Sequence, residues 1–210
     1  MTDEKDPPTT EQKFVLVFDF CSSTLIIEDL HRSELQIVWR NLLISVKEFL
    51  ERERLIHDFE IYKFVGDGWI LLFDLDYPPA YMFSLLKRLC EKYESLFKQT
   101  IRPVLSAPMG TIGITFGLDM GRLIRFIMNR QNEYIGRSIN VAVRLQGAIK
   151  DQDPKPQGKI LVSKPAYDRL RQVHHDYPNW TVKRSLRNIS GNNNSINKLV
   201  KLQLYDSELK

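Results

Sequence analysis

The sequence has 210 residues, of which 43% are hydrophobic and 27% charged, and this composition suits one globular domain with a sizeable core. Its net charge of +4 is compatible with an anionic small substrate but is too weak to indicate a nucleic-acid-binding protein. No apolar run approaches the roughly 18 residues of a membrane span, the polar N-terminus has no signal-peptide core, and the two cysteines, Cys21 and Cys90, fit a reduced cytoplasm, so we expect a cytoplasmic protein.

The first strand follows a polar segment. Residues 1–12 carry two prolines and much charge, which predicts a flexible tail, so that one domain spans 13–210. In FVLVFDFCSST, the five apolar residues 14–18 are continuous rather than alternating. This pattern predicts a strand over 13–19 that is buried on both faces.

A long helix and a hairpin are expected next. Ser22, Ser23 or Thr24 is a suitable N-cap for the helix. The apolar runs EIYKFV and WILLF are then separated by Gly66-Asp67-Gly68, and an Asp-Gly pair suits the positive φ angles of a tight hairpin turn. The apolar positions of the helix recur at helical spacing: Leu35, Val38, Leu42, Val46, Phe49 and Leu50.

The second half of the chain alternates strands with helices. A helix is predicted over 79–99, then two strands in TIGITFGLD and RLIRFIM, and then a helix in RSINVAVRLQGAIK that ends near Gly147 to Lys150. GKILVS is a short strand, and KPAYDRLRQV is a short helix with Pro165 in its first turn. TVKRSL and KLVKLQLY are the last two strands.

The predicted order is therefore β–α–β–β–α–β–β–α–β–α–β–β. Alternation with hairpins predicts an α/β sandwich with a mixed sheet, built on a ferredoxin-like β–α–β–β–α–β core. In such a core the first and third strands are neighbours. Asp19, at the end of the first strand, and Asp67, in the turn before the third, would then lie at the same edge of the sheet.

Two aspartates that meet at one edge repel each other unless a cation lies between them. Hard oxygen ligands suit Mg²⁺ or Mn²⁺, which normally also take substrate phosphates. The turn after Asp19 leads into a helix N-terminus, which favours phosphate. Each feature also has a structural reading, because Asp67 alone suits a hairpin turn and Ser22 to Thr24 alone suit a helix cap.

The sequence resembles the class III nucleotide cyclases, the catalytic domains of adenylate and guanylate cyclases. The resemblance rests on FVLVFDFCSST, IYKFVGDGWILLF and EYIGRSINVAVRLQ in this order, with ITFGLDMG before the third motif and GKILVSKPAYDRL after it. It covers residues 13 to about 175, with a weaker tail to 206. It implies a two-metal mechanism with Mn²⁺ or Mg²⁺, and head-to-tail dimers with shared active sites.

The resemblance also assigns roles to residues. Asp19, Asp67 and the Phe20 carbonyl would hold the metal ions. Asn140 would orient the ribose and Arg144 would stabilise charge on the phosphate, and their i, i+4 spacing puts both on one helical face. The turn residues that would bind the phosphates are Phe20, Cys21, Ser22, Ser23 and Thr24.

The residues that would select the base are less regular. Lys63 matches the base-reading position at which lysine usually accompanies ATP, but Glu133 stands where adenylate cyclases more often have Asp or Thr. Lys63 and Glu133 could read a base edge, or pair with each other and leave a smaller pocket that Trp69 narrows if it faces the site. The late phosphate-binding lysine of the family is missing from its usual position, and Lys198 is the substitute that we expect.

The turn FDFCSST followed by IIEDL is also similar to the stand-alone pyrimidine nucleotide cyclases of bacterial anti-phage systems (Pycsar). In those systems the cyclic product triggers a separate effector protein. The sequence thus predicts a cytoplasmic, homodimeric cyclase that uses UTP, and less readily CTP. The alternatives are an adenylate cyclase on the same scaffold and a degenerate cyclase-homology domain that binds nucleotide without catalysis.

Overall fold

The apolar run of the first strand lies at the centre of the sheet. The computed structural model describes residues 7–170, 177–186 and 195–207, and in it β1 (Thr9–Phe20) pairs antiparallel with β3 (Gly68–Asp74) on one side and β4 (Ile114–Met128) on the other. Alternate β1 side chains enter cores on opposite faces of the sheet, as Phe14, Leu16 and Phe18 do on one face and Val15 and Val17 on the other. The run is continuous because both faces are covered.

The sheet has eight strands in the order β2-β3-β1-β4-β6-β8-β7, with β5 paired to β4. β4 and β6 are parallel, while the other pairs are antiparallel, so the predicted mixed sheet is confirmed. The order β2-β3-β1-β4 is that of a ferredoxin-like core, and β1 and β3 are neighbours as predicted. The remaining strands are β2 (Glu60–Phe64), β5 (Gln131–Ile135), β6 (Lys159–Val162), β7 (Asn179–Ser185) and β8 (Ser195–Gln203).

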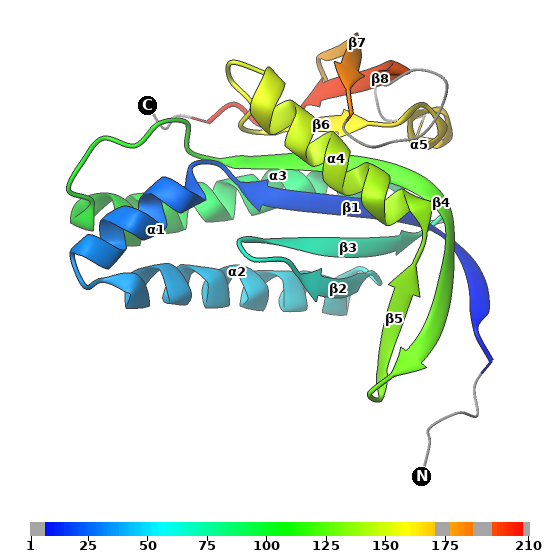
Figure 1. The fold of residues 1–210 in the computed structure, drawn as a ribbon, viewed down its shortest axis with the longest axis horizontal. Helices are drawn as coiled ribbons and strands as arrows, with labels where there is room; N and C mark the ends of the chain where they lie inside the picture. The colour runs from blue at the N-terminus through cyan, green and yellow to red at the C-terminus, as the bar shows by residue number, and fades with distance from the viewer. Residues whose placement is uncertain (1–6, 171–176, 187–194, 208–210) are drawn as a thin grey trace.

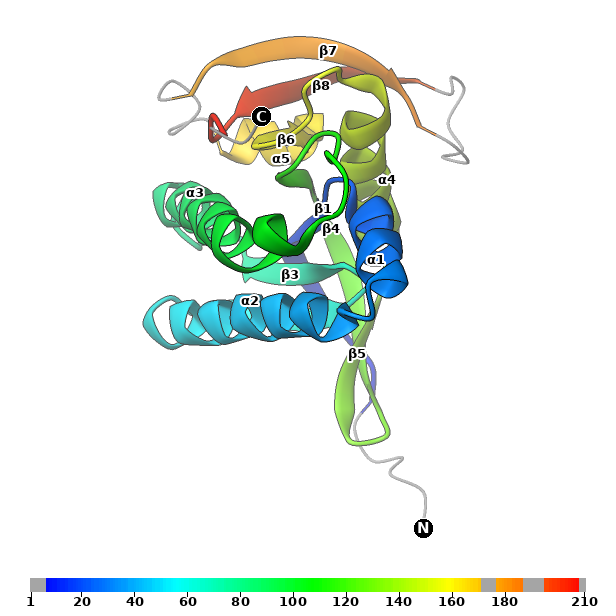
Figure 2. The ribbon, with the colours of Figure 1, turned by 90° about the vertical axis from the view of Figure 1, so that its left-hand side faces the viewer.

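Helices cover both faces of this sheet (Figure 1). α2 (Gln36–Ile56) and α3 (Pro79–Leu96) pack on the face that holds the larger core, and α4 (Arg137–Gln152) crosses the other face over β1 and β4. α1 (Ser23–Arg32) lies at the end of the sheet beside α2, and α5 (Lys164–Arg169) follows β6 (Figures 1 and 2).

Some boundaries differ from those predicted. The long helix after the first strand is broken into α1 and α2, because Glu34 between them adopts a left-handed conformation with φ 57° that no α-helix continues through. β1 begins at Thr9, and α4 extends past Lys150 to Gln152. After α3, a π-helical turn (Phe97–Ile101) and a 3₁₀ turn (Arg102–Val104) lead to β4.

The far end of β4 forms an arm with β5 that projects from the body of the molecule (Figure 2). The exposed fractions of its apolar side chains are 43% for Ile124, 42% for Ile127, 49% for Met128 and 56% for Ile135. Apolar side chains gathered on one projecting hairpin are typical of an interaction surface.

α4 is seated closely on β4. A Cβ atom at Gly117 of β4 would lie 2.2 Å from the Ala142 carbonyl oxygen and 2.4 Å from the Gln146 amide nitrogen of α4. Only glycine therefore fits at position 117, and this contact fixes the height of α4 above the strand that neighbours β1.

A buried carboxylate ties the end of α4 to the sheet. Asp153 is 7% exposed and accepts hydrogen bonds from Lys159 Nζ at 2.8 Å, Lys201 Nζ at 2.6 Å and the Lys155 amide at 3.2 Å. Burial alone would raise the pKa of Asp153, but these three donors lower it to about 2. A pKa below that of the unfolded chain means that the ionised form stabilises the fold.

We expect Asp153→Asn to lower the free energy of unfolding at pH 7 by about 2 kcal/mol. This is the free energy that corresponds to the lowered pKa of the Asp153 carboxylate, and Lys159 and Lys201 also lose a buried partner. The carboxylate contributes above the unfolded pKa of about 4 and loses its contribution as the pH falls towards 2, so the gap from the parent protein should narrow below pH 4. Urea unfolding from pH 7 to pH 3 measures this. The exposed Asp151→Asn on the same helix is the control, and equal stability of both variants at pH 7 would contradict the expectation.

Candidate active site

The two predicted carboxylates meet at the end of β1. Asp19 pairs with Gly68 at the start of β3, and Asp67 is the last residue of the turn between β2 and β3. A Cβ at Gly68 would lie 1.9 Å from the Phe18 carbonyl oxygen, so a glycine is needed for this turn to approach β1. The positive φ of the turn falls on Gly66, at 81°, and not on the Asp-Gly pair as the sequence suggested.

Asp19 is strained electrostatically by its neighbour. Burial, together with a hydrogen bond to Asp67, raises the pKa of Asp19 to about 6, while the nearby Lys150 acts in the opposite direction. Two carboxylates this close to each other resist being ionised together.

Two residues of α4 complete the surroundings of Asp19, and the sequence did not single them out. Lys150 Nζ lies 2.5 Å from Asp19 Oδ2 and donates to the Phe20 carbonyl oxygen at 3.2 Å. Gln146 Nε2 lies 3.4 Å from the same Oδ2 and donates to the buried Thr115 Oγ1 at 2.9 Å. Their i, i+4 spacing predicts that they share one face of α4, but nothing in the sequence places that face against Asp19.

The turn after Asp19 is held by side-chain hydroxyls. Ser22 Oγ donates to the Thr111 carbonyl oxygen at 2.7 Å, and Ser23 Oγ donates to Asp67 Oδ2. Ser22 is the N-cap residue of α1, which is one of the three positions predicted, but its side chain makes no capping hydrogen bond. The hydroxyls of Ser22 and Ser23 bind other segments instead, and Thr24 is exposed.

The remaining predicted turn residues are buried. Cys21 is 2% exposed, and burial raises the pKa of its thiol to about 12, so the thiol stays protonated at neutral pH. The Phe20 ring stacks on Tyr93 in the core with ring centroids 4.4 Å apart, while the Phe20 carbonyl accepts from Lys150 beside Asp19. The backbone of this turn, rather than its buried side chains, is thus what a ligand can reach.

Asn140 and Arg144 lie on α4, away from the carboxylates. Arg144 precedes Gln146 by two residues, a rotation of about 200° around a helix of 3.6 residues per turn. Since Gln146 faces Asp19, Arg144 faces the opposite side, and Asn140 is exposed one turn earlier. One chain therefore keeps its carboxylate pair and its Asn/Arg pair on different surfaces.

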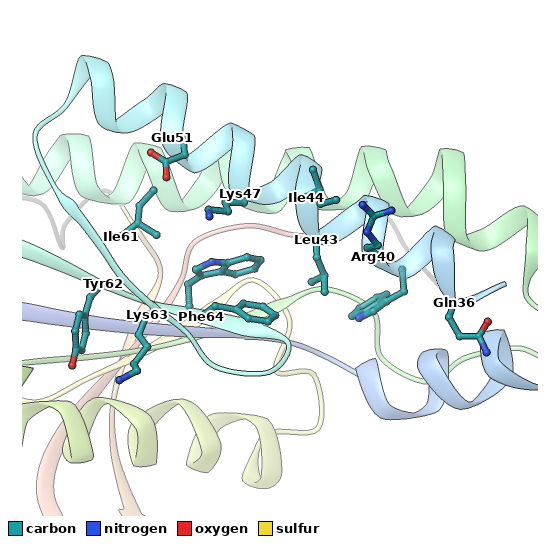
Figure 3. Close-up of a pocket in the computed structure, with 12 residues that line it drawn as sticks. Gln36, Arg40, Leu43, Ile44, Lys47, Glu51, Ile61, Tyr62, Lys63 and Phe64 are labelled. Atoms are coloured by element: carbon teal, nitrogen blue, oxygen red, sulfur yellow. The ribbon is translucent and has the colours of Figure 1, made fainter. Parts of the chain in front are cut away.

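Lys63 and Glu133 form a pair on the α4 side of the sheet. Lys63 Nζ lies 3.1 Å from Glu133 Oε2, and the Tyr62 hydroxyl donates to the same Oε2 at 2.7 Å. An irregularity in the β2–β3 register between Ile61 and Lys63 gives β2 an extra residue, which lets two consecutive side chains point to one face. Figure 3 shows Tyr62 and Lys63 pointing away from α2.

A groove of about 520 Å³ lies on the other side of this hairpin, between α2 and β2 (Figure 3). Trp69 lines it and is 3% exposed, with its ring stacked on Phe18 at a centroid distance of 5.5 Å. Trp69 pairs with Phe18, one position from the Asp19–Gly68 pair, so it faces away from Asp19. Trp69 therefore lies on the α2 side of the sheet, in the groove that Lys63 also lines, and not on the side of Asp19. The other lining residues are Gln36, Trp39, Arg40, Leu43, Ile44, Lys47, Glu51, Ile61, Tyr62, Lys63 and Phe64.

The donor atoms at the end of β1 fit a hard divalent cation. Asp19, Asp67 and the Phe20 carbonyl would hold the ion through oxygen atoms, which are the ligands that Mg²⁺ takes. Among the described residues, no group of three or more His, Cys, Asp or Glu side chains forms a cation site. The side chain of Lys198, the expected phosphate ligand, lies outside the described part of the chain.

No family model and no curated protein matches the sequence. Among solved structures, the adenylyl cyclase CyaB from P. aeruginosa has a TM-score of 0.67 at 20% identity, over 96% of this chain and 99% of that one. The guanylyl cyclase Cya2 has a TM-score of 0.67 at 17% identity, over 94% and 93% of the two chains.

A bacterial light-regulated adenylyl cyclase also matches, with a TM-score of 0.68 at 13% identity, and this chain, matched over 99% of its length, spans 56% of that protein. At these identities the likeness shows the fold, which is that of class III cyclase catalytic domains. In the described ranges, no helix is long and apolar enough to cross a membrane.

Proposed function

We propose that this chain is a nucleotide cyclase that converts a nucleoside triphosphate, with UTP preferred, into its 3′,5′-cyclic monophosphate and pyrophosphate. The ribose 3′-oxygen forms a bond to the α-phosphorus, and the bond from the α-phosphorus to the oxygen that bridges to the β-phosphate breaks. The observation that carries the proposal is the meeting of Asp19 and Asp67 at the end of β1, where the raised pKa of Asp19 marks a place for a cation. The cyclase fold supports the same conclusion.

Asp19, Asp67 and the Phe20 carbonyl would hold the Mn²⁺ or Mg²⁺ ions, two per site in the resembling family. When bound, such ions lower the pKa of the attacking hydroxyl and neutralise phosphate charge. The chain itself contributes the turn after Asp19, where Ser23 holds Asp67 and Ser22 holds the segment around Thr111. These bonds fix the carboxylates before substrate binds, which limits the reorganisation needed for catalysis.

A second copy of the chain would complete each site. Asn140 and Arg144 lie on the outward side of α4, so they are positioned to serve a neighbouring molecule rather than their own carboxylates. The exposed apolar side chains of the β4–β5 arm support a homodimer, because burying them removes apolar surface from water. Arg144 would stabilise charge on the transferring phosphate, and Asn140 would orient the ribose.

The Lys63–Glu133 pair supports uracil as the base. Glu133 Oε2 already accepts from both Tyr62 and Lys63, while the Lys63 ammonium has further hydrogens to donate. Part of the acceptor capacity of Glu133 is therefore already used, whereas Lys63 can still donate. Uracil presents two carbonyl oxygens on either side of one N–H donor, whereas cytosine and adenine each present an amino group that needs an acceptor. We infer the order UTP, then CTP, then ATP.

The cyclic product would act as a second messenger on a separate effector protein, in anti-phage defence. The similarity of FDFCSST and IIEDL to the pyrimidine cyclases of such systems supports this role. In this chain, Asp29 of IIEDL is 4% exposed and accepts from the Ser106 amide at 2.7 Å. That bond ties α1 to the segment before β4, so part of the motif maintains the shape of the turn that carries the phosphates.

The test is a competition among the four NTPs at equal concentration with Mn²⁺, with products identified by mass. We expect one cyclic nucleotide, cUMP, to dominate, because a site that pairs with one base edge leaves buried polar groups unpaired with the wrong base. Dominant cAMP would overturn the pyrimidine preference and leave the cyclase standing. Nucleotide binding without any cyclic product would instead indicate a non-catalytic domain.

Tyr62→Phe is the matched variant for this competition. It frees Glu133 Oε2 from one donor and leaves Lys63 in place, so the share of cCMP and cAMP among the products should rise. Tyr81→Phe, an exposed tyrosine on α3, is the control. An unchanged product ratio in Tyr62→Phe would show that Glu133 does not read the base.

A further inference from the structure

Lys150 of α4 lies beside Asp19, and the roles proposed for α4, those of Asn140 and Arg144, do not explain its position. Its ammonium lies 2.5 Å from Asp19 Oδ2 and 3.2 Å from the Phe20 carbonyl oxygen, which are two of the three atoms proposed to hold metal ions. The side chain of Lys150 is 32% exposed and that of Asp19 is 17% exposed, so solvent reaches the pair only in part. A positive charge already lies where a cation bound to Asp19 would lie.

The charges around Lys150 keep it protonated. Burial alone would lower the pKa of Lys150, but the hydrogen bond and charge of Asp19 and the charge of Asp67 raise it above its usual value. A lysine is a point charge on a flexible four-carbon stem, so it can change partner without a movement of α4. The partner that it would gain lies close by, because Phe20 directly precedes the turn expected to carry the phosphates.

We propose that Lys150 is the residue of this site that binds the polyphosphate. In the nucleotide-free protein its ammonium pairs with Asp19, and when metal and nucleotide bind, the ammonium pairs instead with a β- or γ-phosphate oxygen. The proposal rests on the proposed cyclase function. It gives the chain a phosphate-binding lysine on α4 in place of the one that Lys198 was expected to supply.

The geometry predicts two effects of opposite sign for Lys150→Met, which keeps the length of the side chain and removes its charge. Mn²⁺ should bind the nucleotide-free protein about tenfold more tightly, because a competing positive charge beside Asp19 is gone. Pyrophosphate should bind the Mn²⁺-loaded protein about tenfold more weakly, because one charge-assisted hydrogen bond is lost. If the Lys150–Asp19 ion pair only stabilised the fold, its loss would not strengthen Mn²⁺ binding and weaken pyrophosphate binding together.

The experiment measures free Mn²⁺ by electron paramagnetic resonance and pyrophosphate binding by calorimetry, for the parent protein, Lys150→Met and Lys150→Arg. Lys87→Met, an exposed lysine on α3, makes the same charge change elsewhere and should alter neither affinity. Thermal melting checks that each variant folds, and Lys150→Arg, which keeps the charge, should retain pyrophosphate binding.

Unchanged or weaker Mn²⁺ binding by folded Lys150→Met would show that Lys150 does not compete with the metal ion for Asp19. Unchanged pyrophosphate binding would show that Lys150 does not bind the polyphosphate. These outcomes are separate from a failure of the proposed function, which is seen when the parent protein makes no cyclic nucleotide or binds no Mn²⁺.

Discussion

Asp19→Ala and Asp67→Ala are each expected to lower turnover at saturating Mn²⁺ by at least about 10³-fold, since the ions that these carboxylates hold supply several kcal/mol of transition-state stabilisation. The fold should survive both changes. Burial, with a smaller contribution from Asp67, raises the pKa of Asp19, so removing either carboxylate relieves an unfavourable charge at this site. The melting temperature of the metal-free protein should therefore not fall in proportion to activity. Product formation and thermal melting, measured on the same preparations, test this.

Asp74→Asn is the control for these variants. Asp74 lies at the other end of β3, where it is exposed and pairs with Lys13 at 2.7 Å, so its loss should leave turnover unchanged. Asp67→Asn adds a second comparison, since its amide oxygen can still accept from Ser23 but cannot neutralise a metal ion. Near-normal turnover in either alanine variant would show that the carboxylate pair is not the metal site.

Mixing inactive Asp67→Ala with inactive Arg144→Ala is expected to restore activity to about a quarter of that of the parent protein. With free exchange of subunits, half of the dimers are mixed, and each mixed dimer has one site with both defects and one site with neither. The reason is geometric, since Asp67 lies at the end of β1 and Arg144 on the outward side of α4. Cyclic product formation before and after mixing is the measurement.

The control mixture combines Asp19→Ala with Asp67→Ala. Both residues belong to the same carboxylate pair, so both sites of every dimer carry a defect and no activity should return. Subunit exchange is verified independently with two differently tagged chains. If exchange occurs and the first mixture remains inactive, each chain uses its own Asn/Arg pair or none, and shared sites are excluded.

The sequence was most informative where chemistry and chain periodicity agreed. A continuous apolar run ending in Asp19 predicted a strand covered on both faces, and the hairpin pattern placed Asp67 beside it, as the sheet order confirms. These inferences depend on local pattern and on one topological rule. They did not require knowledge of which side chains approach from distant segments.

What could not be read from the sequence depends on contacts between distant residues. Lys150 and Gln146 meet Asp19 across 131 and 127 positions of chain, and no local signal specifies that α4 crosses β1 at this height. The extra residue of β2 between Ile61 and Lys63 is equally invisible, although it decides that Tyr62 and Lys63 share a face.

The face of the sheet on which Trp69 lies has a simple geometric origin. Successive side chains of a strand point to opposite faces, so the face of Trp69 follows from the pairing of its neighbour Gly68 with Asp19. The sequence does not give the register of β1 and β3, so it does not tell which face Trp69 points to. In the structure Trp69 points to the same face as Phe18, into the core under α2.

The close seating of α4 on Gly117 would couple the two sites of the proposed dimer through one rigid helix. The inner side of α4 carries Lys150 against Asp19 of the same chain, and its outer side would present Arg144 to the site of the neighbouring molecule. In a dimer with shared sites, a tilt of α4 that follows nucleotide binding at one centre also displaces the arginine of the other. Such mechanical linkage is reciprocal in free energy, so the two sites would not titrate independently, and nucleotide saturation curves would depart from a Hill coefficient of about one.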